Sequence, residues 1–420
     1  MMMGGWRETT LGEVCDEVNG IIQTGPFGSQ LHQSDYSEVG IPVVMPKDII
    51  EGRIASDTVA RVSSEHVERL SRHKLRSGDI VYGRRGDIGR QALIRPEQAG
   101  WMCGTGCLRL SLGDEVLDPF FLHYYLRQDD VVGWITNQAV GATMPNLNTG
   151  ILRSVPVRFP PLLVQQRIAG ILSAYDELIE NSQRRIRILE SMARTLYREW
   201  FVHFRFPGHE NHPRVPSHLG EIPQGWEVKK LGEIAEEMRR NVPKGDLDEP
   251  QPYVGLEHIP RRSLALDAWE TTTELGSNKL EFKKGEVLFG KIRPYFHKVS
   301  VAPFDGLCSA DTIVVRARRP EHYAFVVACV SSDELVAHAT ATSNGSKMPR
   351  ANWGVLEEYG VVIPKGKVAE QFSALFADTI AQQQALIFQI KNLRRTRDLL
   401  LPRLLSGQVD ISNLPESISA

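Results

Sequence analysis

Residues Ile168–Trp200 read IAGILSAYDELIENSQRRIRILESMARTLYREW and form one uninterrupted amphipathic pattern. Apolar or small residues recur there in alternating steps of four and three, which is the a/d spacing of a coiled coil. The positions on this first seam are Ile168, Leu172, Tyr175, Ile179, Ser182, Ile186, Leu189, Ala193, Leu196 and Trp200. The other faces are charged or carry amides, so a helix with so narrow a seam requires a partner helix.

A second seam lies 204 residues further along the chain and supplies that partner. Its positions follow the same steps and are Phe372, Phe376, Thr379, Gln383, Leu386, Ile390, Leu393, Arg397, Leu400 and Leu404. We predict that two long helices pair through these two seams, with polar Gln383 and Arg397 setting the register at some cost in stability. The alternative is that both are ordinary core helices of unrelated origin.

Three further pairs of motifs repeat between the two halves of the chain. WRETTLGEV from Trp6 is echoed by WEVKKLGEI from Trp226, and LRSGDIVYGRRGDIGR from Leu75 by FKKGEVLFGKIRPYFHK from Phe282. GATMPNLNTG from Gly141 matches GSKMPRANWG from Gly345, again with an offset of 204 residues. The chain therefore reads as a tandem duplication, in which each half is a mixed globular region followed by a long helix. Such a period is too long for a solenoid repeat.

Local patterns predict a mixed α/β (α+β) fold that is used twice. Strands are expected near Ile41–Met45, Asp79–Tyr82, Gln91–Ile94, Cys107–Ser111, Ser154–Val157, Gly285–Phe289, Lys298–Val301 and Thr312–Arg316. Helices are expected at Pro119–Gln128 and Glu321–Ser331, which are matching places in the two halves. Proline-rich exits precede both long helices. The expected boundaries are a first globular domain at 1–160, a first helix at 161–205, a linker at 206–225, a second globular domain at 226–364, a second helix at 365–408 and a tail at 409–420.

Composition is that of an ordinary globular protein. Hydrophobic residues make up 42% and charged residues 24% of the 420, and no apolar run has the length of a membrane span. The five scattered cysteines argue against a disulfide framework and for a reducing compartment. Cys103 and Cys107 lack two further ligands at a matching spacing, so no metal site is predicted. The net charge of −2 neither indicates nor excludes DNA binding, which depends on local basic clusters.

Catalytic signatures are missing. The chain contains no P-loop and no glycine-rich dinucleotide fingerprint. Glu281-Phe-Lys283 contains the Glu-x-Lys half of a nuclease site, but such tripeptides are common by chance. We therefore expect no catalytic residues and no cofactor in this chain.

Two basic loops occupy matching places in the two halves and are the candidate DNA-binding sites. Each follows a short apolar run and a glycine, and their basic residues are Arg84, Arg85, Arg90, Lys291, Arg293 and Lys298. Flexible backbone combined with Arg and Lys suits phosphate contact and bidentate reading of guanine. The alternative for any one of these side chains is a solvated loop.

With these motifs in place, the chain resembles the specificity (S) subunits of type I restriction–modification enzymes. The resemblance rests on the two Trp-x4-Leu-Gly-Glu openings, TGPFGSQL from Thr24, VPVRFPPLLVQQRIAGIL from Val155, ARTLYREWFVHF from Ala193 and RDLLLPRLLSGQV from Arg397. It covers nearly the whole chain. The second half departs from the pattern, because MPRANW replaces MPNLN and the second exit lacks Pro-Pro.

The resemblance implies two target-recognition domains, at 1–160 and 226–364, that each read one half of a split sequence in double-stranded DNA. It also implies that the two helices pair antiparallel, set the distance between the half-sites and bind two methyltransferase subunits, to which the full complex adds motor–nuclease subunits. The seam Ile168–Trp200 would span about 48 Å, on the order of a dozen base pairs. S-adenosylmethionine, ATP and magnesium would belong to the partners, and the complex would be cytoplasmic. The competing interpretation is a coiled-coil adaptor without DNA specificity.

Overall fold

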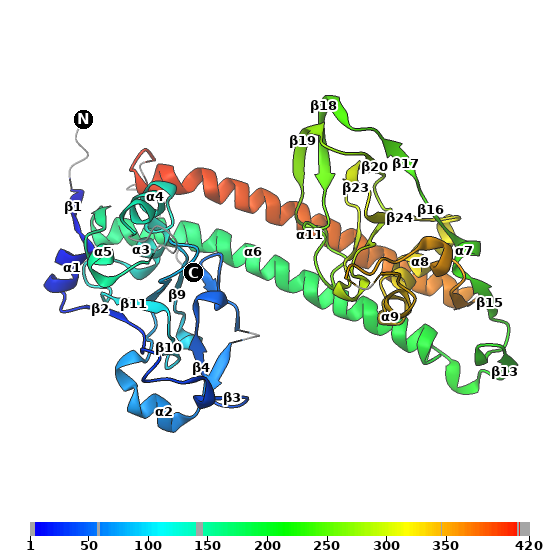
Figure 1. The fold of residues 1–420 in the computed structure, drawn as a ribbon, viewed down its shortest axis with the longest axis horizontal. Coiled ribbons are helices and arrows are strands. Elements are labelled where there is room, and N and C mark those ends of the chain that lie inside the picture. The colour runs from blue at the N-terminus through cyan, green and yellow to red at the C-terminus, as the bar shows by residue number, and fades with distance from the viewer. Residues whose placement is uncertain (1–4, 57–58, 140–145, 346, 410, 412–420) are drawn as a thin grey trace. The chain divides into compact units, whose positions relative to one another are not determined.

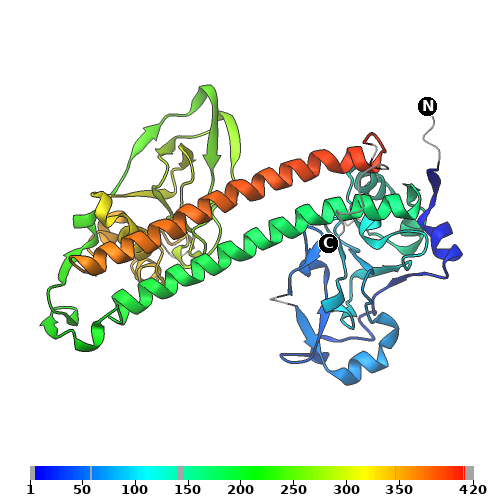
Figure 2. The ribbon, with the colours of Figure 1, turned by 180° about the vertical axis from the view of Figure 1, so that it is seen from behind.

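The computed structural model describes residues 5–56, 59–139, 146–345, 347–409 and 411 of the chain. The chain divides into two compact units. Unit 1 comprises Met1–Glu177 and Arg394–Ala420, and unit 2 comprises Leu178–Leu393. The two long helices, α6 (Leu162–Tyr197) and α11 (Lys367–Leu405), each contribute one part to unit 1 and the rest to unit 2. The two views show these helices side by side (Figures 1 and 2).

The described residues of unit 1 before α6 form short strands and five short α-helices. The strands are β1 (Arg7–Thr10), β2 (Ile21–Thr24), β3 (Tyr36–Ser37), β4 (Ile41–Val44), β5 (Ile49–Ile50), β6 (Arg53–Ile54), β7 (Ala60–Val62), β8 (Ile80–Gly83), β9 (Gln91–Leu93), β10 (Met102–Cys103), β11 (Cys107–Ser111) and β12 (Pro156–Phe159). The helices are α1 (Leu11–Glu17), α2 (Ser64–Arg69), α3 (Pro119–Tyr125), α4 (Asp129–Gln138) and α5 (Thr149–Arg153). The strand orders are β2-β11-β8-β9, β10-β4-β7-β3, β1-β12 and β5-β6.

Unit 2 repeats this arrangement. Its strands are β13 (Arg214–Ser217), β14 (Gly220–Pro223), β15 (Glu227–Lys230), β16 (Ala235–Glu237), β17 (Arg240–Val242), β18 (Gly245–Val254), β19 (Glu270–Leu275), β20 (Lys279–Phe282), β21 (Val287–Gly290), β22 (Val299–Val301), β23 (Gly306–Ser309), β24 (Thr312–Ala317) and β25 (Gly360–Ile363). Its helices before α11 are α7 (Leu231–Ile234), α8 (Tyr323–Val330), α9 (Asp333–Ala341) and α10 (Trp353–Leu356). The order β16-β24-β21-β22 corresponds to β2-β11-β8-β9, and the pair β15-β25 to β1-β12. The predicted duplication of the fold is confirmed.

The repeated Leu-Gly-Glu motif forms the start of a helix in both units. Glu13 accepts a hydrogen bond from the backbone N–H of Thr10 at 3.2 Å, and Glu233 accepts one from the N–H of Lys230 at 2.7 Å. A carboxylate at the third helical position thus caps each helix. The glycine has a packing reason, because a Cβ on Gly12 would lie 2.9 Å from the carbonyl oxygen of Arg153.

The expected strands and helices occur, with boundaries shifted by one or two residues for most of them. The strand expected at Ser154–Val157 is β12, Pro156–Phe159, because residues up to Arg153 belong to α5 and Ser154 caps it. The region 206–225, expected to be a linker, contains the hairpin β13–β14 and the buried ring of Phe206. Pro and Gly there punctuate a hairpin as well as they would an irregular linker.

The long helices are integrated into the core of each unit. In unit 1, Ile168 and Leu172 at the start of α6 share a core with Leu404 near the end of α11. In unit 2, Trp200, which follows α6, lies in one core with Phe372 near the start of α11. The start of one helix therefore meets the end of the other, which makes the pair antiparallel. Among the described residues, no single helix is long and apolar enough to cross a membrane. The bent pair Pro320–Val330 and Asp333–Ala341 has that length and composition only when its two helices are counted together, and it contributes to the core of unit 2.

Candidate nucleic-acid interface

The basic loop of unit 1 connects β8 to β9 and is closed by two backbone contacts. The N–H of Arg84 donates to the carbonyl oxygen of Gly106 at 2.8 Å, and the carbonyl oxygen of Arg84 accepts from the N–H of Leu147 at 2.9 Å. The Nε of Arg84 also donates to the carbonyl oxygen of Leu147 at 3.3 Å. The segment around Leu147 thus holds the loop in place. Residues 141–145 of the preceding GATMP motif lie outside the described residues.

The three arginines of this loop differ in how free they are. Arg85 is exposed, and its guanidinium has no hydrogen bond or ion pair to any residue that the structure describes. Arg90 forms an exposed ion pair with Asp87 at 2.8 Å, the kind of contact that contributes at most about 1 kcal/mol. The guanidinium groups of Arg85 and Arg90 are therefore accessible at the surface, and that of Arg90 is only weakly held.

The backbones of two glycine-containing segments cross next to this loop. A Cβ on Gly25 would lie 2.1 Å from the carbonyl oxygen of Gly104, so the TGPFG motif is fixed by direct contact between two backbones. Phe27 two residues later is 57% exposed. Cys103 and Cys107, which flank this crossing, are buried free thiols. Burial raises the pKa of the Cys103 thiol to about 12 and that of the Cys107 thiol well above its usual value.

The basic loop of unit 2 connects β21 to β22 and has the same closure. The N–H of Lys291 donates to the carbonyl oxygen of Asp311 at 2.8 Å, and the carbonyl oxygen of Lys291 accepts from the N–H of Ala351 at 2.9 Å. Ala351 is the residue 204 positions after Leu147. The ammonium of Lys291 donates to the carbonyl oxygen of Ala310 at 3.2 Å and lies 3.6 Å from Glu237. The two loops therefore differ in sequence, but equivalent backbone hydrogen bonds close each of them.

The remaining basic residues of this loop have opposite environments. Arg293 is exposed, and its backbone has the left-handed φ of +50° that a non-glycine residue adopts only when the surroundings impose it. The surroundings include the N–H of Arg293 donating to the carbonyl oxygen of Pro349 at 2.7 Å. Lys298 instead directs its ammonium inward to the carbonyl oxygen of Leu256, and burial lowers its pKa.

Sequence reasoning missed three residues beside Arg293. The guanidinium of Arg261 lies 4.1 Å from the ring centroid of Phe296, and that of Arg293 lies 5.9 Å from the same centroid. Tyr295 is 51% exposed, and its ring packs edge-on against that of Phe296, with 4.8 Å between the two ring centroids. Aromatic residues next to basic ones inside RPYFHK were a signal for this cluster, whereas nothing in the sequence brings Arg261 to it.

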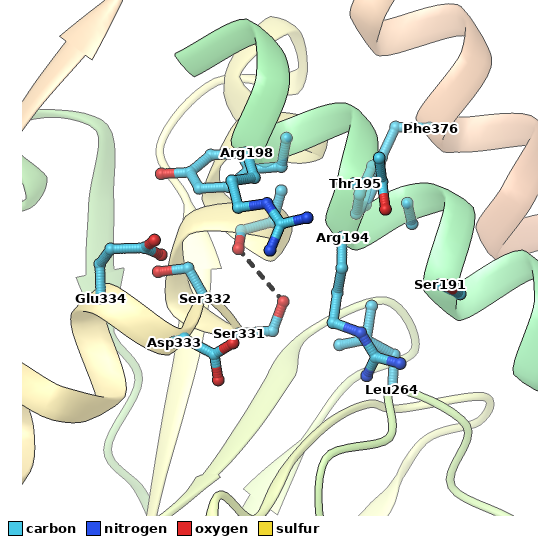
Figure 3. Close-up of a pocket in the computed structure, with 13 residues that line it drawn as sticks. Ser191, Arg194, Thr195, Arg198, Leu264, Ser331, Ser332, Asp333, Glu334 and Phe376 are labelled. Carbon is cyan, nitrogen blue, oxygen red and sulfur yellow. Dashed lines mark hydrogen bonds between the residues drawn. The ribbon is translucent and has the colours of Figure 1, made fainter. Parts of the chain in front are cut away.

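Helix α6 holds the segment that carries Arg261. The buried carboxylate of Glu190 accepts hydrogen bonds from the hydroxyl of Ser263 at 2.5 Å and from the N–H of Leu264 at 2.8 Å. One helical turn on, Arg194 donates to the carbonyl oxygen of Arg262 at 2.7 Å. A cavity of about 210 Å³ lies beside this clamp, between α6 and the turn from α8 to α9; Arg194, Leu264 and Asp333 line it (Figure 3).

The structure buries the predicted helix-pairing seam wholly or in part within each unit. The buried members are Ile168, Leu172, Ile179, Ser182, Ile186, Ala193, Trp200, Phe372, Phe376, Gln383, Leu386, Ile390 and Leu404. The half-buried members are Tyr175, Leu189, Leu196, Thr379, Leu393, Arg397 and Leu400. In unit 1 the polar seam residue Arg397 forms an ion pair with buried Asp176. In the described part of the chain, no group of three or more His, Cys, Asp or Glu is arranged to hold a metal ion.

Comparison with known proteins agrees with this architecture. Residues 3–191 match the family model described as the type I restriction modification DNA specificity domain. The MjaIX type I restriction enzyme specificity subunit of Methanocaldococcus jannaschii is 25% identical over 389 residues, covering 89% of this chain and 88% of the relative. The EcoDI specificity subunit of Escherichia coli is 26% identical over 344 residues, covering 71% and 76%. The S subunit crystal structure from M. genitalium superposes with a TM-score of 0.60 at 15% identity, covering 96% of this chain and 97% of that one, and therefore shares the fold.

Two β-rich units on a pair of long helices, together with the match to a DNA specificity domain, define a DNA-recognition protein of restriction–modification systems. The chain belongs to the specificity (S) subunits of type I restriction–modification systems, the non-catalytic component that recognises the DNA target. The resemblance inferred from the sequence is confirmed, and the interpretation as an adaptor without DNA specificity is set aside.

Proposed function

We propose that this subunit recognises a bipartite target in double-stranded DNA, with one half read by residues 1–160 and the other by residues 226–364. One observation carries this proposal: both units close a basic loop with the same two backbone contacts, through Leu147 in one and Ala351 in the other. The side chains on the two loops differ, which suits two different half-sites on one frame. In this proposal the helices at 161–205 and 365–408 are the spacer, and the segment 206–225 links the first helix to residues 226–364.

The environments of the six basic residues assign them different roles in this proposal. Arg85 and Arg293 have exposed guanidinium groups without an acceptor among the described residues, and these read base edges. Partial pairing with the protein distinguishes Arg84, Arg90 and Lys291. Their remaining N–H donors suit contacts to phosphates. Lys298 is occupied inside the protein and positions the loop.

Arg293→Ala tests the assignment of unit 2. We expect it to weaken binding of the target duplex by roughly 10- to 100-fold and to relax one position in one half of the target only, because a bidentate contact to one base is lost. Arg85→Ala should act in the same way on the other half. Sequencing of modified bases in host DNA reports both halves of the target directly. An equal loss of binding on DNA that lacks the target would instead make these residues nonspecific phosphate contacts.

Exposed apolar side chains on the two long helices support the proposed binding of methyltransferase subunits. In unit 2, α6 exposes Leu178, Ile188 and Met192 by 50%, 50% and 61%, and α11 exposes Leu375 and Phe388. Large apolar side chains exposed on a helix are candidates for contact with a partner protein. We propose that the helices dock two methyltransferase subunits, to which motor–nuclease subunits are added, in a cytoplasmic complex on DNA. The chemistry and its cofactors belong to these partners.

Replacing Ile188 and Met192 together by aspartate tests this docking surface. We expect loss of co-purification with the methyltransferase subunit, because two desolvated apolar contacts become charges. The chain should remain folded, since both side chains point to solvent. Arg184→Ala together with Arg187→Ala, at exposed positions of the same helix, changes the net charge by the same amount and is the charge-matched control. Undiminished co-purification of the Ile188/Met192 variant would place the partner elsewhere.

A further inference from the structure

We propose that Arg261 is a base-reading residue of the second half-site and reads guanine together with Arg293. The inference deepens the proposed function, on which it rests, by naming a residue outside the basic loop. It begins from the shared ring: Arg261 lies 4.1 Å and Arg293 5.9 Å from the centroid of Phe296. Two like charges are brought to one aromatic ring, an arrangement that folding alone does not require.

Both guanidinium groups lack an acceptor within residues 5–56, 59–139, 146–345, 347–409 and 411. Arg261 and Arg293 are exposed, and neither side chain donates a hydrogen bond or forms an ion pair within the described part of the chain. Most other arginines of unit 2 are paired. Those that form an ion pair with a carboxylate are Arg205, Arg239, Arg240, Arg262, Arg316, Arg318, Arg319 and Arg350. The neighbouring Arg262 pairs with Asp333, so these two adjacent arginines have different environments.

The backbone that carries Arg261 is held on both sides. The N–H of Arg262 donates to the carbonyl oxygen of His297 at 2.8 Å, and Arg261 itself forms an antiparallel bridge with Lys298. On the other side, Glu190 of α6 accepts from the backbone N–H of Leu264 at 2.8 Å. A side chain on a fixed backbone and a stacked ring loses little further freedom on binding, which favours affinity.

The chemistry of this arrangement favours base reading over a simple phosphate contact. Stacking on Phe296 restricts the plane of the planar guanidinium, whereas the two-pronged donor edge stays free. That edge matches the O6 and N7 acceptors of guanine in the major groove. A phosphate would be served equally well by a flexible ammonium, so Arg261→Lys separates the two possibilities.

The test is the methylation motif written in host DNA by the complete methyltransferase complex carrying each variant. We expect Arg261→Ala and Arg261→Lys to make one guanine position in the second block degenerate, with discrimination at that position falling roughly 10- to 100-fold. The first block should be unchanged. The control Arg319→Ala removes another exposed arginine of unit 2, one that pairs with Glu321, and it should leave the motif intact.

Two outcomes would overturn the inference. One is an unchanged motif for both Arg261 variants. The other is rescue by Arg261→Lys, with Arg261→Ala losing affinity equally on DNA that lacks the target. If Arg261→Ala fails to fold, Arg261→Lys, which keeps the charge and most of the stem, carries the comparison. The wild-type complex separates this inference from the proposed function: absence of any split motif in wild-type cells with active methylation refutes the proposed function, whereas a split motif that the Arg261 variants do not alter refutes only the role of Arg261.

Discussion

Replacing Arg397 by alanine is expected to destabilise unit 1 by about 3–5 kcal/mol, because it leaves a buried carboxylate without its cation. Arg397 of α11 forms an ion pair with Asp176 of α6, and the two side chains are 16% and 12% exposed. Asp176 also accepts a hydrogen bond from the hydroxyl of Tyr124 at 2.8 Å, which ties α3 to the same carboxylate. One buried charge therefore joins both helices to the globular part of unit 1.

The effect is measured by urea unfolding and by hydrogen exchange of the peptide that covers α3. Arg395→Ala, two residues earlier on the exposed face of α11, is the matched control and should change the free energy of unfolding by less than about 0.5 kcal/mol. Equal stabilities of the two variants would contradict a structural role of the ion pair. Faster exchange confined to α3 and the start of α6 would locate the loss.

The same pair predicts an acid-sensitive unit 1. Burial of Asp176 opposes ionisation, but the hydrogen bond and charge of Arg397, together with the hydroxyl of Tyr124 and the charge of Arg127, outweigh it, so that the net pKa lies below its usual 3.8. A carboxylate with a depressed pKa contributes stability that is present above the unfolded pKa and is lost as the pH falls through the folded one. In Arg397→Ala the pKa of Asp176 should rise, and acid unfolding should begin at higher pH than in the wild type.

Replacing Phe372 by alanine is expected to destabilise unit 2 by about 3–5 kcal/mol, because it leaves a cavity in an aromatic cluster. Phe372 is 1% exposed. Its ring lies 4.6 Å from that of Phe201 in an edge-on contact and 6.0 Å from that of Trp200. The cluster fastens the start of α11 to the residues that follow α6, so the helix pairing of unit 2 depends on it.

Thermal unfolding and tryptophan fluorescence measure this loss, since Trp200 lies in the cluster. Leu375→Ala is the control, because Leu375 is on the same helix but 52% exposed and should change stability by less than about 1 kcal/mol. Phe372→Leu should recover part of the loss by filling some of the cavity. A Phe372→Ala chain as stable as the Leu375→Ala chain would show that the pairing does not depend on the cluster.

The heptad pattern of both long helices and the repeat of 204 residues were sufficient to predict the fold used twice. These features are local or periodic, so they survive in a single sequence. The repeated Leu-Gly-Glu motif also had a local meaning, since Glu13 and Glu233 cap the helices that they begin. Short strands such as β5 and β10 carried no such signal, because two residues are too few to show a period.

The candidate site was only partly visible in the sequence. Arg85 and Arg293 were found from the basic loops, whereas the inward direction of Lys298 depends on Leu256, which is 42 residues away. The position of Arg261 over Phe296 depends on pairing across 35 residues and on the clamp from Glu190. Whether a charged side chain is free or satisfied is set by contacts of this kind.

The amino-acid sequence thus determined the duplicated frame, the helix pair and the family, because heptads, caps and motifs are written in short spans of residues. The tertiary structure alone decided which arginines remain without an acceptor and which carboxylates anchor a unit to its helices. The physical reason is that burial and pairing of charge arise only when segments distant in the sequence meet.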